Sequence, residues 1–247
     1  MRTFDTSSAA FYSRVRPTYP AELYFWLSRQ VEDTHRVWDC ACGTGQASID
    51  LAVYFSHVEA SDISEAQIAK ATPHRNVNYS VQPAEYTHFP DDYFDAVCVA
   101  HALHWFELDA FWREVRRVLK PGGKVFIWGY NWARFESVLD LAVKEHILPI
   151  LQPYWPEKTV LLRNQYRSVD FPFDDVDVPE FELKCRWTMS QAFAFMRSWS
   201  AAQIMVEQHG DERLRQAEFE VEQLWQDPQR KLDVTLPFFC YAGQFKS

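Results

Sequence analysis

The sequence has few of the features that bind a protein to a membrane or to a polyanion such as nucleic acid. No apolar run approaches the length of a membrane span, and the first residues hold no apolar core of signal-peptide length. Lys and Arg number 25 against 34 Asp and Glu, and the net charge of −9 disfavours a broad surface for nucleic acid. We therefore expect a cytoplasmic protein with neither a membrane nor a nucleic-acid partner. The sequence leaves the oligomeric state open.

Cysteine and the common catalytic motifs are also scarce. Five Cys is an odd number in a chain of 247 residues, which favours a reducing compartment over a disulfide framework. Cys40 and Cys42 form a Cys-x-Cys pair, but the sequence has no second pair of cysteines close together and no His near this one, so no metal site is predicted. No G-x-S-x-G elbow, phosphate-binding P-loop or H-E-x-x-H helix is found in the sequence.

What the chain does have is a regular alternation of strand-like and helix-like segments up to residue 130. The helical patterns begin at Ala21, after the turn at Gly45, at Ser64 and at Leu108, and the last is predicted to end at Pro121. Apolar strand patterns separate them, and residues 94–103 form the near-continuous apolar run that is typical of a buried parallel strand. This alternation predicts an α/β fold with a doubly wound, mostly parallel, Rossmann-like sheet.

The rhythm changes after Tyr130. Residues 132–180 mix a helical stretch with Pro-rich, Trp-rich and Asp-rich loop sequence, and we interpret them as a cap-like insertion over the carboxyl ends of the strands. Beyond them, residues 181–188 read as a further strand, residues 189–226 as helices and residues 232–245 as a closing strand. We expect a single domain over residues 1–247, with residues 1–20 as an N-terminal lid segment.

The stretch VWDCACGTGQAS, residues 37–48, indicates which class of nucleotide-like ligand the protein binds. A pyrophosphate turn reads G-x-G-x-x-G, but the corresponding residues here are Gly43, Gly45 and Ser48. Asp39 ends the strand before the turn, and its carboxylate would repel a pyrophosphate and suit a cation. S-adenosylmethionine (SAM) has no phosphate and carries an ammonium and a sulfonium, so the turn favours SAM as the cofactor.

A second acid supports an adenosine ligand. Asp62 ends the next strand pattern, 23 positions after Asp39, where a carboxylate can accept hydrogen bonds from both ribose hydroxyls. The neighbouring Ile63 can cover one face of the adenine. Such an acid also occurs in nicotinamide dinucleotide sites, so on its own it does not select SAM.

Several blocks together resemble class I SAM-dependent methyltransferases. They are D-x-A-C-G-T-G-Q at 39–46, the acid after the second strand, PAEYTHFPDDYFDAVCVAHALHWF at 83–106 and EVRRVLKPGGKV at 114–125. The chain is most similar to the type 11 group and its trans-aconitate-methyltransferase-like members. RVRPTYP near the N-terminus, AHALHWF and RWTMSQAFAFMRSWSAAQ carry that closer likeness. The resemblance implies a seven-stranded sheet with a helical cap inserted after strand five.

The resemblance also implies a set of cofactor contacts. It places Asp39 near the methionine amino group, Asp62 at the ribose, and the Ala100 carbonyl at the methionine ammonium. The remaining cofactor-binding residues that it implies are Tyr12, Arg16, Ala41, Cys42, Gly43, Thr44, Gly45, Ile63, Ala84 and Glu85. Arg16 is expected to pair with the methionine carboxylate. Ala41 departs from the glycine of many members, and its methyl group is tolerable if its backbone φ is negative.

Candidates for the acceptor side follow the fourth and fifth strands. His104 is the candidate catalytic residue, as a proton acceptor or as a hydrogen-bond partner of the acceptor, and Trp105, Tyr130 and Trp132 are expected to contact the substrate. His101 is interpreted as structural, and Trp199 as packing its helix onto the sheet. Arginine is the usual partner of a carboxylate, so the acid-binding candidates in and beside the cap are Arg134, Arg163, Arg167 and Arg186.

The leading functional hypothesis is methyl transfer from SAM to a small molecule, with a carboxylate as one possible acceptor. One alternative is a SAM-binding, methyltransferase-like protein that serves as a regulator or partner. A second is a nicotinamide-dependent dehydrogenase, which Asp39 and the missing third glycine disfavour. Because in-line transfer needs a base only when the nucleophile is protonated, the sequence does not choose between O-, N- and S-methylation.

Overall fold

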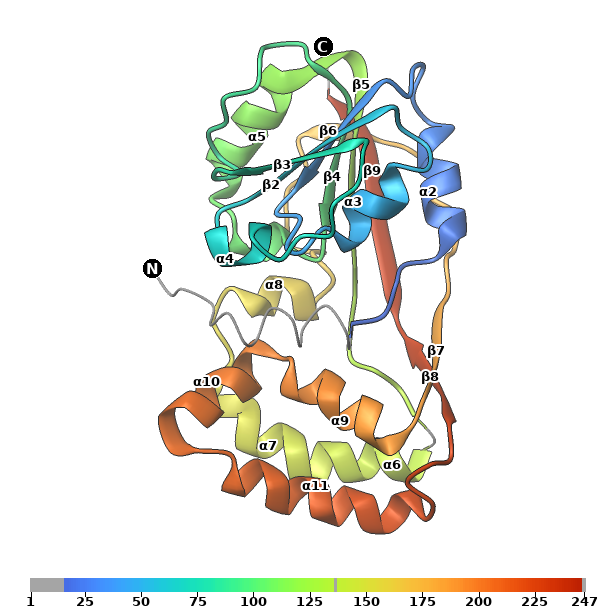
Figure 1. The fold of residues 1–247 in the computed structure, drawn as a ribbon, viewed down its shortest axis with the longest axis vertical. Helices are drawn as coiled ribbons and strands as arrows, with labels where there is room; N and C mark the ends of the chain where they lie inside the picture. The colour runs from blue at the N-terminus through green and yellow to red at the C-terminus, as the bar shows by residue number, and fades with distance from the viewer. Residues whose placement is uncertain (1–15, 136, 246–247) are drawn as a thin grey trace.

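A computed structural model describes residues 16–135 and 137–245 of the chain. Its sheet runs in the order β3-β2-β1-β4-β5-β9-β6 (Figure 1). The strands from β3 to β5 are parallel, and β9 is antiparallel to both of its neighbours. The strands of this sheet are β1 (Arg36–Cys40), β2 (His57–Asp62), β3 (Val77–Val81), β4 (Phe94–Ala100), β5 (Leu119–Tyr130), β6 (Phe173–Asp175) and β9 (Phe238–Phe245). The predicted seven-stranded, mostly parallel sheet is thereby confirmed.

Helices cover both faces of this sheet (Figure 1). On one face, Leu23, Leu27 and Leu51 pack on the sheet from α2 and α3, and on the other face Phe111 and Val115 pack from α5. The helices of this layer are α2 (Ala21–Ser28), α3 (Gln46–Leu51), α4 (Glu65–Ile68) and α5 (Leu108–Val118), with the short 3₁₀ helix η1 (Leu103–Trp105) before α5. Ser64 caps α4, as predicted, by accepting a hydrogen bond from the Gln67 backbone N–H.

The end of α5 was predicted wrongly. The helix ends at Val118 rather than at Pro121, because Leu119 is already extended and pairs with Phe94 of β4. Proline disfavours helical geometry in the residue before it, here Lys120, so the chain leaves the helix before the proline is reached. The Asp-rich segment that was interpreted as loop also contains β6, the edge strand of the sheet.

A second, mostly helical layer lies below the carboxyl ends of the parallel strands (Figure 1). It draws on residues beyond 180 as well as on residues 137–163. Its elements are α6 (Ser137–Ala142), the π-helical turn η2 (Val143–Ile147), α7 (Leu148–Leu151), η3 (Gln152–Tyr154), α8 (Thr159–Arg163), β7 (Leu183–Trp187), α9 (Met189–Arg197), α10 (Ser200–His209), α11 (Glu212–Trp225) and β8 (Leu232–Leu236). Pro149 has no N–H for an α-helical bond, and the π turn directly precedes its helix.

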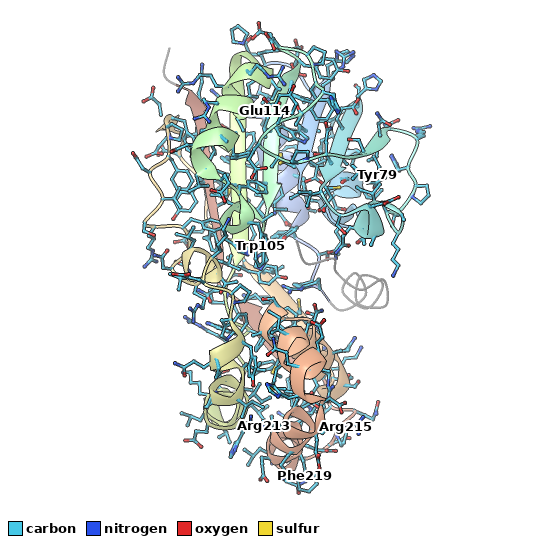
Figure 2. The ribbon with its side chains drawn as sticks, turned by 90° about the vertical axis from the view of Figure 1, so that its left-hand side faces the viewer. Tyr79, Trp105, Glu114, Arg213, Arg215 and Phe219 are labelled. Atoms are coloured by element: carbon cyan, nitrogen blue, oxygen red, sulfur yellow. The ribbon has the colours of Figure 1, made fainter. Side chains whose placement is uncertain are left out.

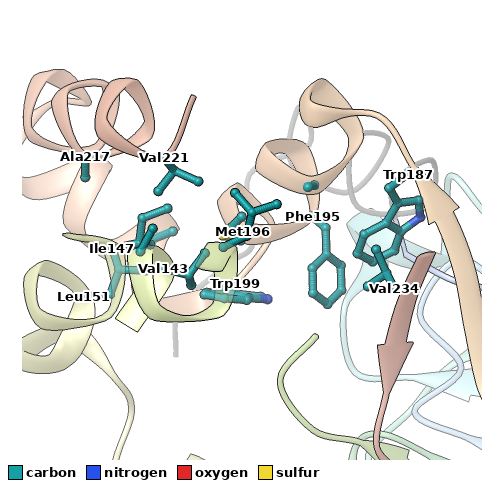
Figure 3. Packing of buried hydrophobic residues seen from close by; sticks show 14 of the residues in the cluster. Val143, Ile147, Leu151, Trp187, Phe195, Met196, Trp199, Ala217, Val221 and Val234 are labelled. Atoms are coloured by element: carbon teal, nitrogen blue, oxygen red, sulfur yellow. The ribbon is translucent and has the colours of Figure 1, made fainter. Parts of the chain in front are cut away.

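This helical layer has its own apolar core. Figure 3 shows Ile147, Met196 and Val221, from three different helices, packed side by side, and all three are almost fully buried. The strand predicted at 181–188 contains β7, which pairs with β8 in a separate two-stranded sheet. The predicted closing strand is divided at Pro237 into β8, which belongs to the helical layer, and β9, which belongs to the large sheet. None of the described helices combines the length and apolar character that a membrane crossing requires.

Candidate functional site

A cavity of about 970 Å³ lies between the two layers. Its upper wall is made by the residues that follow β1, β2, β3, β4 and β5, and its lower wall by α8, α9 and α10. Trp105 lies at this junction of the two layers (Figure 2). Of the predicted site residues, the cavity is lined by Arg16, Ala41, Cys42, Gly43, Thr44, Asp62, Ile63, Ala84, Glu85, Ala100, His104, Trp105, Tyr130 and Trp132. Tyr12 lies outside the described residues, and Asp39 and Gly45 do not line the cavity.

The turn after β1 is built from left-handed backbone. Ala41, Gly43 and Gly45 have φ values of 56°, 58° and 84°. The condition of a negative φ at Ala41 is therefore not met, and the turn holds an alanine where glycine is favoured. At Gly45 a Cβ atom would lie 2.1 Å from the Tyr79 hydroxyl oxygen, whereas at Gly43 it would meet only the Gln67 side chain at 4.0 Å. The Gly43 backbone therefore lies open to the cavity, with room for a ligand against it.

Asp62 holds this turn to the end of β2. One of its carboxylate oxygens accepts a hydrogen bond from the Gly43 N–H at 2.9 Å, and the other accepts one from the Ser64 N–H at 2.8 Å. Burial raises the pKa of Asp62, and the hydrogen bonds from Ser64 and Gly43 oppose that effect. Each carboxylate oxygen can accept a further hydrogen bond. The exposed Ile63 and the small Ala84 also line the cavity, so this part of it can accept a ribose and a flat base.

Asp39 lies beneath the turn and is fully buried. Its Oδ2 accepts a 2.5 Å hydrogen bond from the Ser48 hydroxyl, and its Oδ1 has no hydrogen-bond partner among the described residues. Burial raises the pKa of Asp39 to about 7, although the Ser48 bond lowers it, and nearby Asp62 adds to the rise. With this pKa, Asp39 is only partly ionised at neutral pH, and a positive charge near its Oδ1 would favour the charged form.

Arg16 connects the N-terminal segment to both layers. Its guanidinium donates a 2.8 Å hydrogen bond to the Tyr130 hydroxyl and a 3.4 Å bond to the Ser198 carbonyl of the helical layer. The same group lies 5.4 Å from the centre of the Phe195 ring, within range of a cation–π interaction. Arg16 therefore brings a positive charge to the middle of the cavity wall.

Two histidines follow β4. His101 is stacked on the Tyr130 ring at 4.3 Å, and burial lowers its pKa well below the usual range, in keeping with the structural interpretation. His104 lines the cavity, and its Nδ1 lies 2.9 Å from the Tyr166 hydroxyl. Burial, followed by the charge of Arg16, lowers the pKa of His104 to about 3. The ring is therefore neutral at neutral pH.

Three tryptophans from separate segments form the opposite wall. Trp132 packs edge-on against Trp155 at 5.0 Å and against Trp199 at 4.9 Å. Trp199 thus contacts the cavity and the core of the helical layer, so the interpretation that it packs its helix onto the sheet was wrong. Of the four arginine candidates for binding an acid, only Arg163 lines the cavity, and exposed Arg186 lies 3.3 Å from Asp233.

The chain is similar to known proteins over most of its length. The methyltransferase domain family of type 11 matches residues 38–127, which span β1 to β5. A "putative methyltransferase" of Dictyostelium discoideum is 29% identical over 193 residues, covering 76% of this chain and 73% of its own. The solved structure of a "putative type II methyltransferase" from Anaeromyxobacter dehalogenans is 36% identical with a TM-score of 0.84, covering 93% of this chain and 97% of its own.

The chain belongs to the class I SAM-dependent methyltransferases. A "probable S-adenosylmethionine-dependent methyltransferase" of Saccharomyces cerevisiae, 29% identical over 228 residues and matching 78% of each chain, agrees with this assignment. Membership of this methyltransferase family implies SAM as the methyl donor. The open Gly43 backbone and the carboxylate of Asp62 fit a ligand with a ribose, and Asp39 beneath the turn adds negative charge near it when it is ionised.

Some residues of this methyltransferase site could not be predicted from the sequence. Trp155 follows a 3₁₀ helix, Tyr166 lies on an irregular loop and Phe195 on a helix face, and all three reach the cavity or its wall from the helical layer. None follows a strand of the parallel sheet, so the rule that placed the other candidates does not apply to them. The sequence contains ten Trp and 19 Phe, but their number does not say which of them meet in one wall.

Proposed function

We propose that this methyltransferase transfers the methyl group of SAM to a carboxylate of a small molecule and forms a methyl ester. The observation that carries the proposal is the division of the cavity into two halves of different chemistry. The half beside Asp62 and Glu85 is acidic and open to a ribose, whereas the other half combines Arg163 with an aromatic wall. An arginine next to aromatic rings suits an anion with an apolar body.

SAM supplies a methyl group that its sulfonium already activates, so the protein's part is to position the reactants and to exclude water. We propose that Asp62 holds the ribose, that Ile63 and Ala84 border the adenine with Glu85, and that Ala100 offers its carbonyl to the methionine ammonium. Arg16 would pair with the methionine carboxylate. The other cofactor residues of this proposal are Tyr12, Asp39, Ala41, Cys42, Thr44, Gly43 and Gly45.

On the acceptor side, His104, Trp105, Tyr130 and Trp132 would contact the substrate, and residues 132–180 would act as a cap and residues 1–20 as a lid. A carboxylate is ionised at neutral pH and needs no general base. The low pKa of His104 fits this reaction, because the ring is a poor proton acceptor at neutral pH. The rate of transfer should then be nearly flat from pH 6 to pH 8, whereas transfer assisted by a base that titrates between pH 6 and pH 8 would rise over that range.

Binding of the cofactor is tested by calorimetry with SAM and, in parallel, with NADH. Asp62→Ala should weaken SAM binding by roughly tenfold or more, because it removes the ribose acceptor and one anchor of the turn. Gly43→Val should abolish binding, because it places a branched side chain on left-handed backbone beside the ligand. Tight binding of NADH without binding of SAM would overturn the assignment of the cofactor site.

Turnover is tested by the release of S-adenosylhomocysteine in the presence of aromatic and aliphatic carboxylic acids, with matched alcohols and amines as controls. The proposal expects the acids alone to be methylated. Turnover of the amines or alcohols would move the acceptor to another class. Binding of SAM without turnover of any compound would favour a regulatory or partner protein.

A further inference from the structure

Tyr166 contacts the site from a segment between α8 and β6 to which the reaction assigns no part. The side chain is fully buried, and its ring packs edge-on against Phe239 of β9 at 5.4 Å. Its hydroxyl lies 2.9 Å from Nδ1 of His104, and the two rings are inclined by 29°. Tyr166 is therefore held against the only candidate catalytic side chain.

The backbone that holds Tyr166 is strained. Gln165 and Tyr166 have φ values of 60° and 58°, and left-handed geometry costs a residue with a side chain roughly 1–2 kcal/mol. Neighbouring groups fix it in place: the Tyr166 N–H donates to the Leu161 carbonyl at 2.8 Å, and the Tyr241 hydroxyl donates to the Gln165 carbonyl at 2.7 Å. Two such residues in succession are kept where the surroundings require that placement of the side chain.

The direction of the hydrogen bond between Tyr166 and His104 follows from the lack of another acceptor for the hydroxyl proton. Tyr166 is fully buried, and among the described residues Nδ1 of His104 is the one hydrogen-bond partner of its hydroxyl. If Nδ1 carried a proton and donated it to the tyrosine oxygen, the buried O–H would be left without an acceptor, which is costly. The hydroxyl therefore donates its proton to Nδ1.

The tautomer of His104 follows in turn. A neutral imidazole that accepts at Nδ1 carries its proton at Nε2. Burial and Arg16 keep the pKa of the ring near 3, so the ring carries a single proton at neutral pH. Nε2 has no hydrogen-bond partner within residues 16–135 and 137–245, yet it is not a fully buried atom. Since the ring lines the cavity, Nε2 is accessible from the cavity. An N–H donor is thus presented to the acceptor half.

We propose that Tyr166 is a positioning residue that fixes His104 as the Nε2–H tautomer, so that His104 donates a hydrogen bond to the methyl acceptor and does not remove a proton from it. The inference rests on the proposed function for the nature of the acceptor. On a carboxylate, the donor would hold the oxygen that is not methylated and leave the other oxygen in line with the methyl group.

The tautomer is measured by ¹⁵N–¹H NMR of the imidazole in the complex with S-adenosylhomocysteine, without any acceptor. The wild-type protein should show His104 protonated at Nε2 alone from pH 6 to pH 8. Tyr166→Phe keeps the ring and removes the proton donor, so it should yield a mixture of the two tautomers. Observation of a charged ring or of the Nδ1–H tautomer in the wild-type protein would overturn the inference, whether or not methyl transfer occurs.

Tyr241→Phe is the matched control. It removes a hydroxyl that holds the same strained segment, through the Gln165 carbonyl, and it leaves His104 untouched. With the acid that is turned over fastest, Tyr166→Phe should lower kcat about tenfold, because a tenfold loss corresponds to the free energy of about one hydrogen bond. The affinity for SAM should not change. Tyr241→Phe should stay within about twofold of wild type. Equal losses in the two variants would reduce Tyr166 to a structural role.

His104→Gln and His104→Asn distinguish a donor from a base even if Tyr166→Phe folds poorly. The glutamine amide can present an N–H near the position of Nε2, whereas the shorter asparagine cannot. A donor role predicts that the Gln variant is at least about fivefold faster than the Asn variant. Equal inactivity of the two variants, with SAM binding intact, contradicts the donor role.

Discussion

The two walls of the cavity are constructed in different ways. The wall under the sheet is made largely of turns that directly follow parallel strands, and its geometry depends on backbone: left-handed residues at Ala41, Gly43 and Gly45, and backbone N–H groups bound by Asp62. The wall of the helical layer is made of side chains, with rings from Trp132, Trp155 and Trp199 brought together by tertiary packing.

This difference matches the two tasks of a methyltransferase site. The cofactor is the same in every member, so backbone geometry that tolerates few substitutions suits its wall. The acceptor varies between enzymes, and a wall of side chains from loops and helices can change with little effect on the sheet. We therefore expect substitutions in the turns after β1 and β2 to act on SAM binding and stability, and substitutions in the aromatic wall to act on the acceptor.

The largest effect should come from Gly45→Ala. The new methyl group would lie 2.1 Å from the Tyr79 hydroxyl oxygen, so Tyr79 must move and lose its 2.9 Å bond to the Thr72 carbonyl, in addition to the backbone strain at a φ of 84°. We expect a loss of about 3 kcal/mol in the free energy of unfolding, measured by urea denaturation, and weaker SAM binding.

Gly122→Ala is the control for that substitution. Gly122 has a φ of 83°, and a Cβ atom there would meet nothing within 4 Å, so only the backbone strain remains. A loss of about 1 kcal/mol with unchanged SAM binding is expected. Equal losses at the two glycines would mean that the contact with Tyr79 does not matter for the turn.

The second effect is a pH dependence at Asp39. Burial raises the folded-state pKa from 3.8 to about 7, so the folded protein binds this proton more tightly than the unfolded chain. The stabilisation is complete below the unfolded pKa and is lost as the pH rises towards 7. Asp39→Asn lacks this titration, so the stability of wild type relative to the variant should fall by about 2 kcal/mol between pH 5.0 and pH 6.5.

Urea denaturation of both proteins at the two pH values measures this difference, and other titrating carboxyls contribute equally to both proteins. Ser48→Ala provides a second check, because the Ser48 hydroxyl stabilises the charged carboxylate and its loss should enlarge the pH dependence. A difference between wild type and Asp39→Asn that does not change with pH would show that Asp39 is ionised throughout in the folded protein.

The same contrast explains which parts of the molecule the sequence predicted. The seven-stranded sheet and the residues after its strands were found, because parallel strands end at one edge and the residues after them must share it. The left-handed φ of Ala41 was not found, since alanine gives no sign of that conformation. Trp155 and Tyr166 were missed because their positions depend on how the helical layer packs on the sheet, which no local periodicity records.

A smaller effect, confined to the acceptor, is expected for Trp155→Ala. The half-buried ring lies 5.0 Å from Trp132 in the aromatic wall, and its removal should raise the KM for the acid about tenfold and leave the affinity for SAM unchanged. Trp26→Ala is the matched control, since this half-buried Trp of α2 packs on Phe126 and Phe181 away from the cavity. A change in SAM affinity with Trp155→Ala would contradict the division between the two walls.

The smallest effect is expected for Ala41→Gly, and its sign tests how the sheet wall is built. Relief of the left-handed strain at a φ of 56° favours the folded state by roughly 1–2 kcal/mol, while the added freedom of glycine in the unfolded chain opposes it by about 0.4–1 kcal/mol. We expect a net gain between zero and about 1.6 kcal/mol in the free energy of unfolding, measured by urea denaturation, with SAM binding unchanged or slightly tighter. If the variant is instead destabilised, the Ala41 methyl group contributes packing in the sheet layer that exceeds the strain of its backbone, and the turn depends on side chains there too.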